Sequence, residues 1–127
     1  ASMFDKLIAS HILGLIQESL EKILFRFSGI SCSDDFLLDE TGMMKLDSIC
    51  MKLSAMGESV KNLDKVTNKE LLILYPEIPW KSVMGIRDII VHHYFDVDAL
   101  EIFRISKENV PELLSVIDKM INDLTEN

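Results

Sequence analysis

Apolar residues recur at intervals of three and four positions along most of this chain, and this spacing constrains the fold more than any other feature. Residues 4–27, 41–63 and 109–124 each carry a broad apolar stripe of this kind. A period near 3.6 residues places such side chains on one face of an α-helix. No segment alternates apolar and polar residues as a strand would, and no Asn-Gly hairpin is present. The sequence therefore predicts an all-α protein.

Capping residues mark the expected helix ends in the first half of the chain. Gly29 predicts the end of the first helix, and residues 28–40 are typical of a linker with one short capped turn. Thr67 and Glu70 have the spacing of a capping box, which predicts Thr67 as the cap of another short helix. Gly57 lies inside the second long helix, where a glycine usually permits close approach of another backbone. It serves either tight helix packing or the opening of room beside a functional stretch.

Prolines and further caps delimit the second half. Residues 75–80, Tyr-Pro-Glu-Ile-Pro-Trp, form a rigid connector, because each proline holds the preceding residue in an extended conformation. Pro79 suits the first turn of a helix over residues 80–94. Asp98 predicts the cap of another short helix, and Asn109, with a proline two residues later, predicts the cap of the last one. An up-and-down helical bundle of four main helices plus one or two short helices follows.

Composition bounds the class of protein. The 127 residues fit one domain, which we expect over residues 3–127, because Ala1 and Ser2 resemble a cloning remnant. A net charge of −8 excludes nucleic-acid binding through a diffuse basic field, so RNA would have to be bound locally or with a partner's help. Cys32 and Cys50 lack CxxC spacing and no signal peptide precedes them, which predicts free thiols and a cytoplasmic protein. No apolar run has the length of a membrane span.

The stretch Gly-Ile-Arg-Asp-Ile-Ile-Val-His-His-Tyr, residues 85–94, adds polar groups to an apolar helical pattern. On a regular helix Arg87 and Tyr94 share one face within about 40°, whereas His92 lies about 140° from Arg87. Asp88 and His92 are an i,i+4 pair, so the carboxylate can hold the imidazole, while His93 points elsewhere. Either the helix ends near His92, so that Arg87 and His92 converge, or a second chain in a two-fold dimer completes the site.

These residue types suit phosphodiester chemistry. An arginine is a permanent cation whose planar fork fits phosphate, and a histidine titrates near neutral pH and serves as general acid or base. Arg87 and His92 could therefore cleave RNA without a metal, with the histidine activating the ribose 2′-OH and the arginine stabilising the transition state. The alternative is structural: Arg87, Asp88 and His92 could form a buried polar network that fixes helix packing.

Other chemistries have weaker support. His92 and His93 with Asp96 and Asp98 could suggest a metal site, but adjacent histidines face different sides of a helix and no HExxH or Cys/His framework accompanies them. We therefore expect no metal and no cofactor. The chain also lacks a glycine-rich phosphate loop and a nucleophile elbow, and Cys50 has no activating neighbour in sequence.

The ordered set of motifs resembles the HepT-like branch of the HEPN superfamily of nucleotide-binding helical proteins. Arg87, His92 and Tyr94 match the R-x4-H-x-Y motif of that family. Residues 56–63, 75–80, 85–88, 94–98 and 110–113 follow the family's other motifs in the same order. His93 stands where a small residue is expected, and Phe103 where the family often has tryptophan.

The resemblance implies a function. HepT-like proteins are all-α, dimeric toxins of toxin–antitoxin pairs, similar to ribonucleases that cut RNA without metal, and a minimal nucleotidyltransferase neutralises them. Arg87 and His92 would be the catalytic pair, with Asp88 and His93 in supporting positions. Tyr94 would be the site of AMPylation by the partner. In the alternative reading, the same surface is a non-catalytic module that binds a nucleotide or docks the nucleotidyltransferase.

Overall fold

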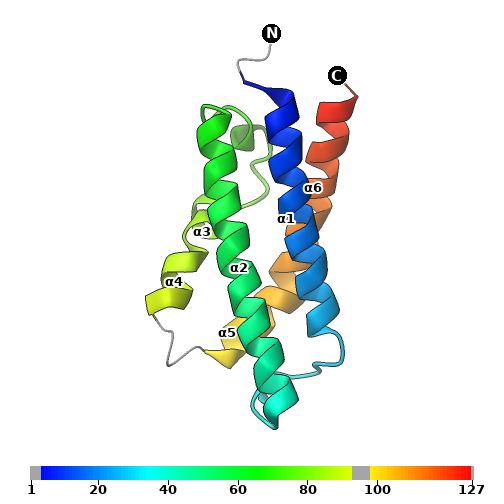
Figure 1. Cartoon of the computed structure of the whole chain (residues 1–127), viewed down its shortest axis with the longest axis vertical. Coiled ribbons are helices and arrows are strands. Elements are labelled where there is room, and N and C mark those ends of the chain that lie inside the picture. Colours follow the sequence, from blue (N-terminus) through cyan, green and yellow to red (C-terminus); the bar gives the residue numbers. More distant parts are fainter. Residues whose placement is uncertain (1–3, 93–97, 127) are drawn as a thin grey trace.

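The computed structural model describes residues 4–92 and 98–126, without the side chains of Val91 and His92. Three long helices, α1 (Lys6–Phe27), α2 (Glu40–Val66) and α6 (Val110–Thr125), lie side by side as a bundle, and both ends of the chain lie at the same end of it (Figure 1). Within the described residues every regular element is helical. The predicted all-α bundle is confirmed.

The core follows the apolar stripes read from the sequence. All three long helices contribute fully buried side chains, which include Leu13, Ile16, Leu20, Ile23, Ile49, Leu53, Leu63, Ile117 and Met120. Phe36 adds a buried ring from the linker, on a 3-10 turn, η1 (Ser33–Phe36). In that turn the Asp35 carboxylate accepts hydrogen bonds from the backbone amides of Ser31 and Cys32, which lowers the pKa of Asp35. None of the described helices is long and apolar enough to cross a membrane.

The predicted end of the first helix is confirmed, whereas the predicted cap at Thr67 is wrong. Gly29 adopts a left-handed conformation with φ of 87° just after α1. Thr67, however, is fully buried and ends α2 instead of starting a new helix. Its hydroxyl donates to the Leu63 carbonyl at 2.7 Å, because α2 continues past the last residue of the apolar stripe. Only a short 3-10 turn, η2 (Leu72–Leu74), follows.

The connector at residues 75–80 is attached to the bundle by two hydrogen bonds. The Trp80 indole donates to the Tyr75 carbonyl at 2.8 Å. The Tyr75 hydroxyl donates to the Asp123 carboxylate on α6 at 2.6 Å. Burial and this carboxylate both raise the pKa of Tyr75 above its usual value. The connector therefore fixes where the following helices start.

The single helix predicted over residues 80–94 is two helices. α3 (Trp80–Met84) ends at Gly85, and α4 (Ile86–His92) begins directly after it. The Gly85 amide still bonds back to the Lys81 carbonyl at 3.1 Å, so the break is a local change of direction. Figure 1 shows α3 and α4 as a short arm beside α2, outside the three-helix bundle.

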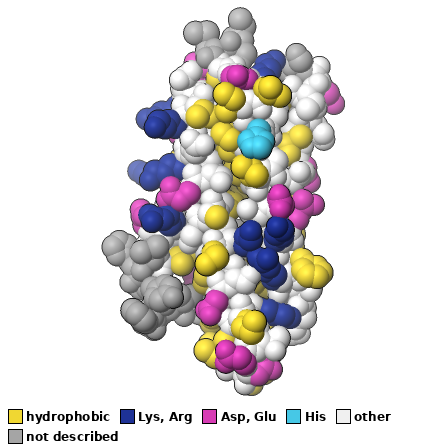
Figure 2. Space-filling model, viewed as in Figure 1, with side chains coloured by type: hydrophobic (Ala, Val, Ile, Leu, Met, Phe, Trp, Pro, Cys, Tyr) yellow, Lys and Arg dark blue, Asp and Glu magenta, His cyan; other side chains and the backbone are white. Residues whose placement is uncertain are grey.

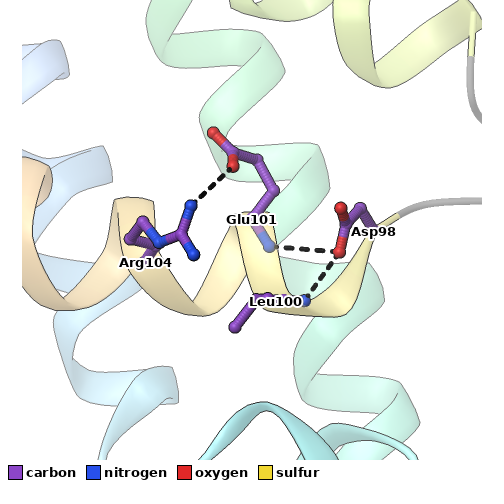
Figure 3. A network of polar contacts seen from close by, with 4 residues as sticks. All are labelled: Asp98, Leu100, Glu101 and Arg104. Carbon is purple, nitrogen blue, oxygen red and sulfur yellow. Dashed lines mark hydrogen bonds and ion pairs between the residues drawn. The ribbon is translucent and has the colours of Figure 1, made fainter.

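The chain returns to the bundle through α5 (Ala99–Arg104). Asp98 caps it as predicted, because its carboxylate accepts from the amides of Leu100 at 3.0 Å and Glu101 at 3.3 Å (Figure 3). The predicted cap at Asn109 is wrong. A π-helical segment, η3 (Ile105–Asn109), continues from α5 into α6, so Asn109 has helical backbone angles and its side chain caps no free amide.

Candidate functional site

Gly57 positions the α3–α4 arm. A Cβ atom at this residue would lie 2.7 Å from the Ile86 Cγ2 and 2.9 Å from the Val83 carbonyl oxygen. Only a glycine lets the turn between α3 and α4 rest this closely on α2. The predicted close approach of another backbone is thus confirmed. It also brings the start of α4 next to Glu58, since the Arg87 amide nitrogen lies 3.8 Å from the same Cβ position.

Arg87 projects from the outer side of α4. Ile86 and Ile90 face the core with 9% and 8% exposure, and this orients the helix so that Arg87 points outward. The guanidinium lies 3.6 Å from the Glu58 carboxylate on α2 and 3.9 Å from that of Asp88, and half of the side chain remains exposed. Arg87 is therefore held by two carboxylates yet still accessible to a phosphate. Arg87 and Asp88 are thus not buried as the structural alternative expected, while the His92 part of that network lies outside the described residues.

The other predicted site residues are only partly described. Asp88 is exposed beside Arg87, in the first turn of α4. The backbone of α4 extends to His92, but the His92 side chain, His93 and Tyr94 lie outside the described residues. The pairing of Asp88 with His92 and the convergence of His92 on Arg87 therefore stay predictions.

A basic groove beside this site was not anticipated from the sequence. This open groove of about 800 Å³ lies along the second half of α2, and Met84 of α3 is part of its lining. Its lining includes Lys61, Lys65 and Lys69 together with Glu58, the carboxylate that contacts Arg87. The sequence feature that could have indicated the groove is the spacing of these lysines at every fourth residue. By itself, this spacing is typical of a solvated helix face.

The alternative chemistries gain no support among the described residues. Of the metal set considered above, the His92 side chain, His93 and Asp96 lie outside the described residues, and Asp98 caps α5. Among the described side chains, no group of three or more His, Cys, Asp or Glu could hold a metal ion. Both cysteines are free. Burial, with the nearby Asp47 carboxylate, raises the pKa of Cys50 to about 11, which keeps it a thiol at neutral pH. His11 is exposed on α1, a helix that takes no part in the Arg87 site.

Comparison with known proteins identifies the family. The family described as ribonuclease HepT-like matches residues 16–120, which include α4 and the Arg-x4-His-x-Tyr motif. The chain belongs to the HepT-like family. This confirms the resemblance inferred from the motifs.

Three relatives agree with this assignment. A protein of Thermococcus cleftensis named probable ribonuclease HepT is 30% identical over 83% of this chain and 88% of its own length. A candidate RNase of Methanocaldococcus jannaschii is 30% identical over 86% of this chain and 84% of its own. A second one from that organism is 38% identical over 58% of this chain and 60% of its own. No solved structure matches the chain.

Proposed function

We propose that this HepT-like protein is a metal-independent endoribonuclease in which Arg87 and His92 act on the same phosphodiester. The observation that carries the proposal is the half-exposed Arg87 guanidinium, held on α4 by Glu58 in a chain of a ribonuclease family. A phosphate that enters can replace the Glu58 contact, because a guanidinium binds phosphate through two parallel hydrogen bonds.

The cleavage step needs a base and a cation. His92 takes the proton of the ribose 2′-OH, and the 2′-oxygen attacks the adjacent phosphorus. The bond from phosphorus to the 5′-oxygen breaks, and that oxygen leaves with a proton as a hydroxyl. The products are a 2′,3′-cyclic phosphate and a 5′-OH end. Arg87 stabilises the negative charge that develops on the phosphate oxygens in the transition state.

The helix geometry supports a site shared between two chains. The backbone of α4 is helical to residue 92. Positions 87 and 92 lie about 140° apart around a regular helix. Ile89, three residues before His92 and thus on the same side of α4, is 59% exposed. Among the described residues, α4 is therefore unpacked at Ile89. A homodimer with its two-fold axis near α4 would bring His92 of one chain to Arg87 of the other.

We further propose that the protein is the toxin of a toxin–antitoxin pair, neutralised by a cognate nucleotidyltransferase. In this reaction the Tyr94 phenol oxygen attacks the α-phosphate of ATP, and pyrophosphate leaves. The resulting AMP group adds an anion on the face that Arg87 shares with Tyr94 on a regular helix. It would pair with Arg87 and exclude RNA. Mass spectrometry after incubation with the partner and ATP should find AMP on Tyr94, and an adduct elsewhere would contradict this switch.

The nuclease proposal is tested with the purified chain, RNA and EDTA. We expect cleavage by the wild type and a loss of about 10²-fold or more for His92→Ala and for Arg87→Ala. His11→Ala is the matched control, because His11 is exposed on α1, and it should cleave normally. Undiminished cleavage by His92→Ala would refute the catalytic assignment. Specific binding of nucleotides without any cleavage would favour a non-catalytic module.

A further inference from the structure

The groove beside Arg87 concentrates positive charge on a chain that is acidic overall. Acidic residues exceed basic ones by 21 to 13, yet Lys61, Lys65 and Lys69 all line this one groove. Figure 2 shows Lys and Arg side chains following the left edge of the view, on the side of α2 where α3 and α4 lie. A local basic track of this kind is what an acidic protein requires to bind a polyanion.

The three groove lysines lack the contacts that Lys22 and Lys45 make. Lys22 pairs with Glu18 at 2.8 Å, and Lys45 donates to the Ser28 carbonyl at 3.1 Å. In the described part of the chain, no carboxylate forms an ion pair with any of the groove lysines. The nearest acidic neighbours in the lining are Asp64, which is half-buried, and Glu58, which faces Arg87. The lysine charges are therefore available to a ligand.

In the turn that ends α2, Lys69 has a backbone conformation that is unfavourable for a residue with a side chain. Asn68 and Lys69 have φ angles of 56° and 60°, the left-handed region that is unfavourable for residues with a Cβ atom. Strained residues of this kind concentrate at functional sites. Free carbonyl oxygens at the end of α2 would repel an anion. In this turn, carbonyls of the last turn of α2 already accept hydrogen bonds. The Lys69 amide donates to Asp64 and the Thr67 hydroxyl to Leu63, at 2.9 and 2.7 Å.

The groove leads directly to the proposed catalytic arginine. Glu58 lines it and contacts Arg87, and Met84 lines it one turn before Arg87. Lys61 and Lys65 are four residues apart, so they are offset by about 6 Å along the helix axis, close to the distance between neighbouring phosphates of an extended strand. Two of the cations lie on α2 and the third lies in the turn that ends it, and a single row of this kind fits one strand. Among the described residues the lining contains no aromatic side chain, which favours recognition of the backbone over the bases.

We propose that the groove of Lys61, Lys65 and Lys69 binds the phosphate backbone of single-stranded RNA on one side of the bond that Arg87 acts on. This inference rests on the proposed ribonuclease function. It assigns a substrate class and a direction of approach to that site: the strand runs along the second half of α2 and reaches Arg87 at the Glu58 end of the groove.

The test measures binding separately from cleavage. The probe is a labelled single-stranded 2′-O-methyl RNA, which lacks the attacking hydroxyl, and affinity is followed by fluorescence anisotropy over a series of salt concentrations. For Lys65→Gln/Lys69→Gln we expect weaker binding and a slope of log K against log salt that is shallower by about 1.4, because each neutralised phosphate accounts for about 0.7 of the slope. Lys65→Arg/Lys69→Arg retains the charge and should bind like the wild type.

The matched control is Lys22→Gln/Lys52→Gln, which removes the same charge from α1 and α2 outside the groove. It should leave the salt slope unchanged. Equal salt slopes for the groove and control variants would overturn the proposal, and so would a wild type that does not bind the probe. Groove variants that lose binding of the nucleotidyltransferase but still bind RNA would also overturn it. If the groove dependence holds but no RNA is cut, the ribonuclease proposal alone fails. If RNA is cut and the groove variants bind normally, the groove proposal alone fails.

Discussion

At the scale of single residues, the position of Arg87 depends on Gly57, although the two residues are far apart in sequence. The missing side chain at Gly57 lets the α3–α4 turn lie against α2, and this contact is what brings Arg87 to Glu58. An arginine on a free helix surface would adopt many conformations. Here its charge is oriented by a carboxylate of another helix, so the packing at residue 57 determines the geometry at residue 87.

Gly57→Ala should therefore damage both stability and activity. Alanine favours an isolated helix by about 1 kcal/mol over glycine. At this position, however, the new Cβ would meet the Val83 carbonyl at 2.9 Å, and a backbone atom cannot move without shifting α3 and α4. We expect a net destabilisation of about 1–3 kcal/mol in urea unfolding and reduced RNA cleavage.

Gly14→Ala provides the control for that substitution. It also lies inside a long helix, α1, but nothing lies within 4 Å of its Cβ position. This variant should be stabilised by up to about 1 kcal/mol and should retain activity. Destabilisation of both variants to the same extent would show that helix context, and not the contact with the α3–α4 turn, explains the effect.

At the scale of elements, the sequence predicted those features that depend on neighbouring residues. The apolar stripes, the end of α1 at Gly29 and the cap at Asp98 are of this kind, because each is formed by groups within a few positions. The errors at Thr67 and Asn109 arose because residue types that often start a helix lie elsewhere in one: Thr67 ends α2, and Asn109 lies in the helical segment between α5 and α6. A Thr-x-x-Glu pattern is compatible with either end of a helix, and only packing of α2 selects one.

The candidate site was predictable to the same extent. The pattern of residues 85–94 singled out Arg87 as a candidate, but it left open whether this side chain is exposed or buried. Its contact with Glu58 joins two helices and has no local signal. The groove lysines were visible as a spacing, but Met84 of α3 is needed to make a groove of that face. Contacts between elements thus set the limit of what this sequence predicts.

The connector between η2 and α3 gives a prediction at this scale. Tyr75→Phe removes the 2.6 Å hydrogen bond to Asp123 and should lower the free energy of unfolding by about 1 kcal/mol at neutral pH. The folded-state pKa of Tyr75 is raised above its usual value of 10.0, so the unfolded chain loses this proton first and wild-type stability should fall as pH rises above that value. Tyr75→Phe should remove this contribution to the alkaline slope.

Urea unfolding at neutral pH and near pH 10 to 11 checks this expectation. Cys50 has a raised pKa of about 11, against 9.0 for a free thiol, and so adds its own loss of stability over the same range. Both proteins are therefore compared in a Cys50→Ala background. An alkaline slope that is unchanged by Tyr75→Phe would mean that the hydrogen bond to Asp123 does not control the titration of Tyr75.

At the scale of the whole molecule, the bundle and the α3–α4 arm have different roles. α1, α2 and α6 bury the core, while α4 lies at the side of the bundle with Arg87 and Ile89 exposed (Figure 1). An arm of this kind presents its polar face away from the core. On a regular helix, positions 87 and 92 lie about 140° apart, and the shared site proposed above would need a second copy of α4.

Mixing two inactive variants tests whether the site is shared between chains. In a homodimer of Arg87→Ala or of His92→Ala, each proposed site lacks one of its two groups. In a mixed dimer the Arg87→Ala chain supplies His92 and the His92→Ala chain supplies Arg87, so one of the two sites is complete. Random exchange gives half mixed dimers with half of their sites intact, so we expect about one quarter of wild-type cleavage. Cleavage that stays absent after confirmed exchange would place both groups in one chain and would require the helix to depart from regular geometry near His92.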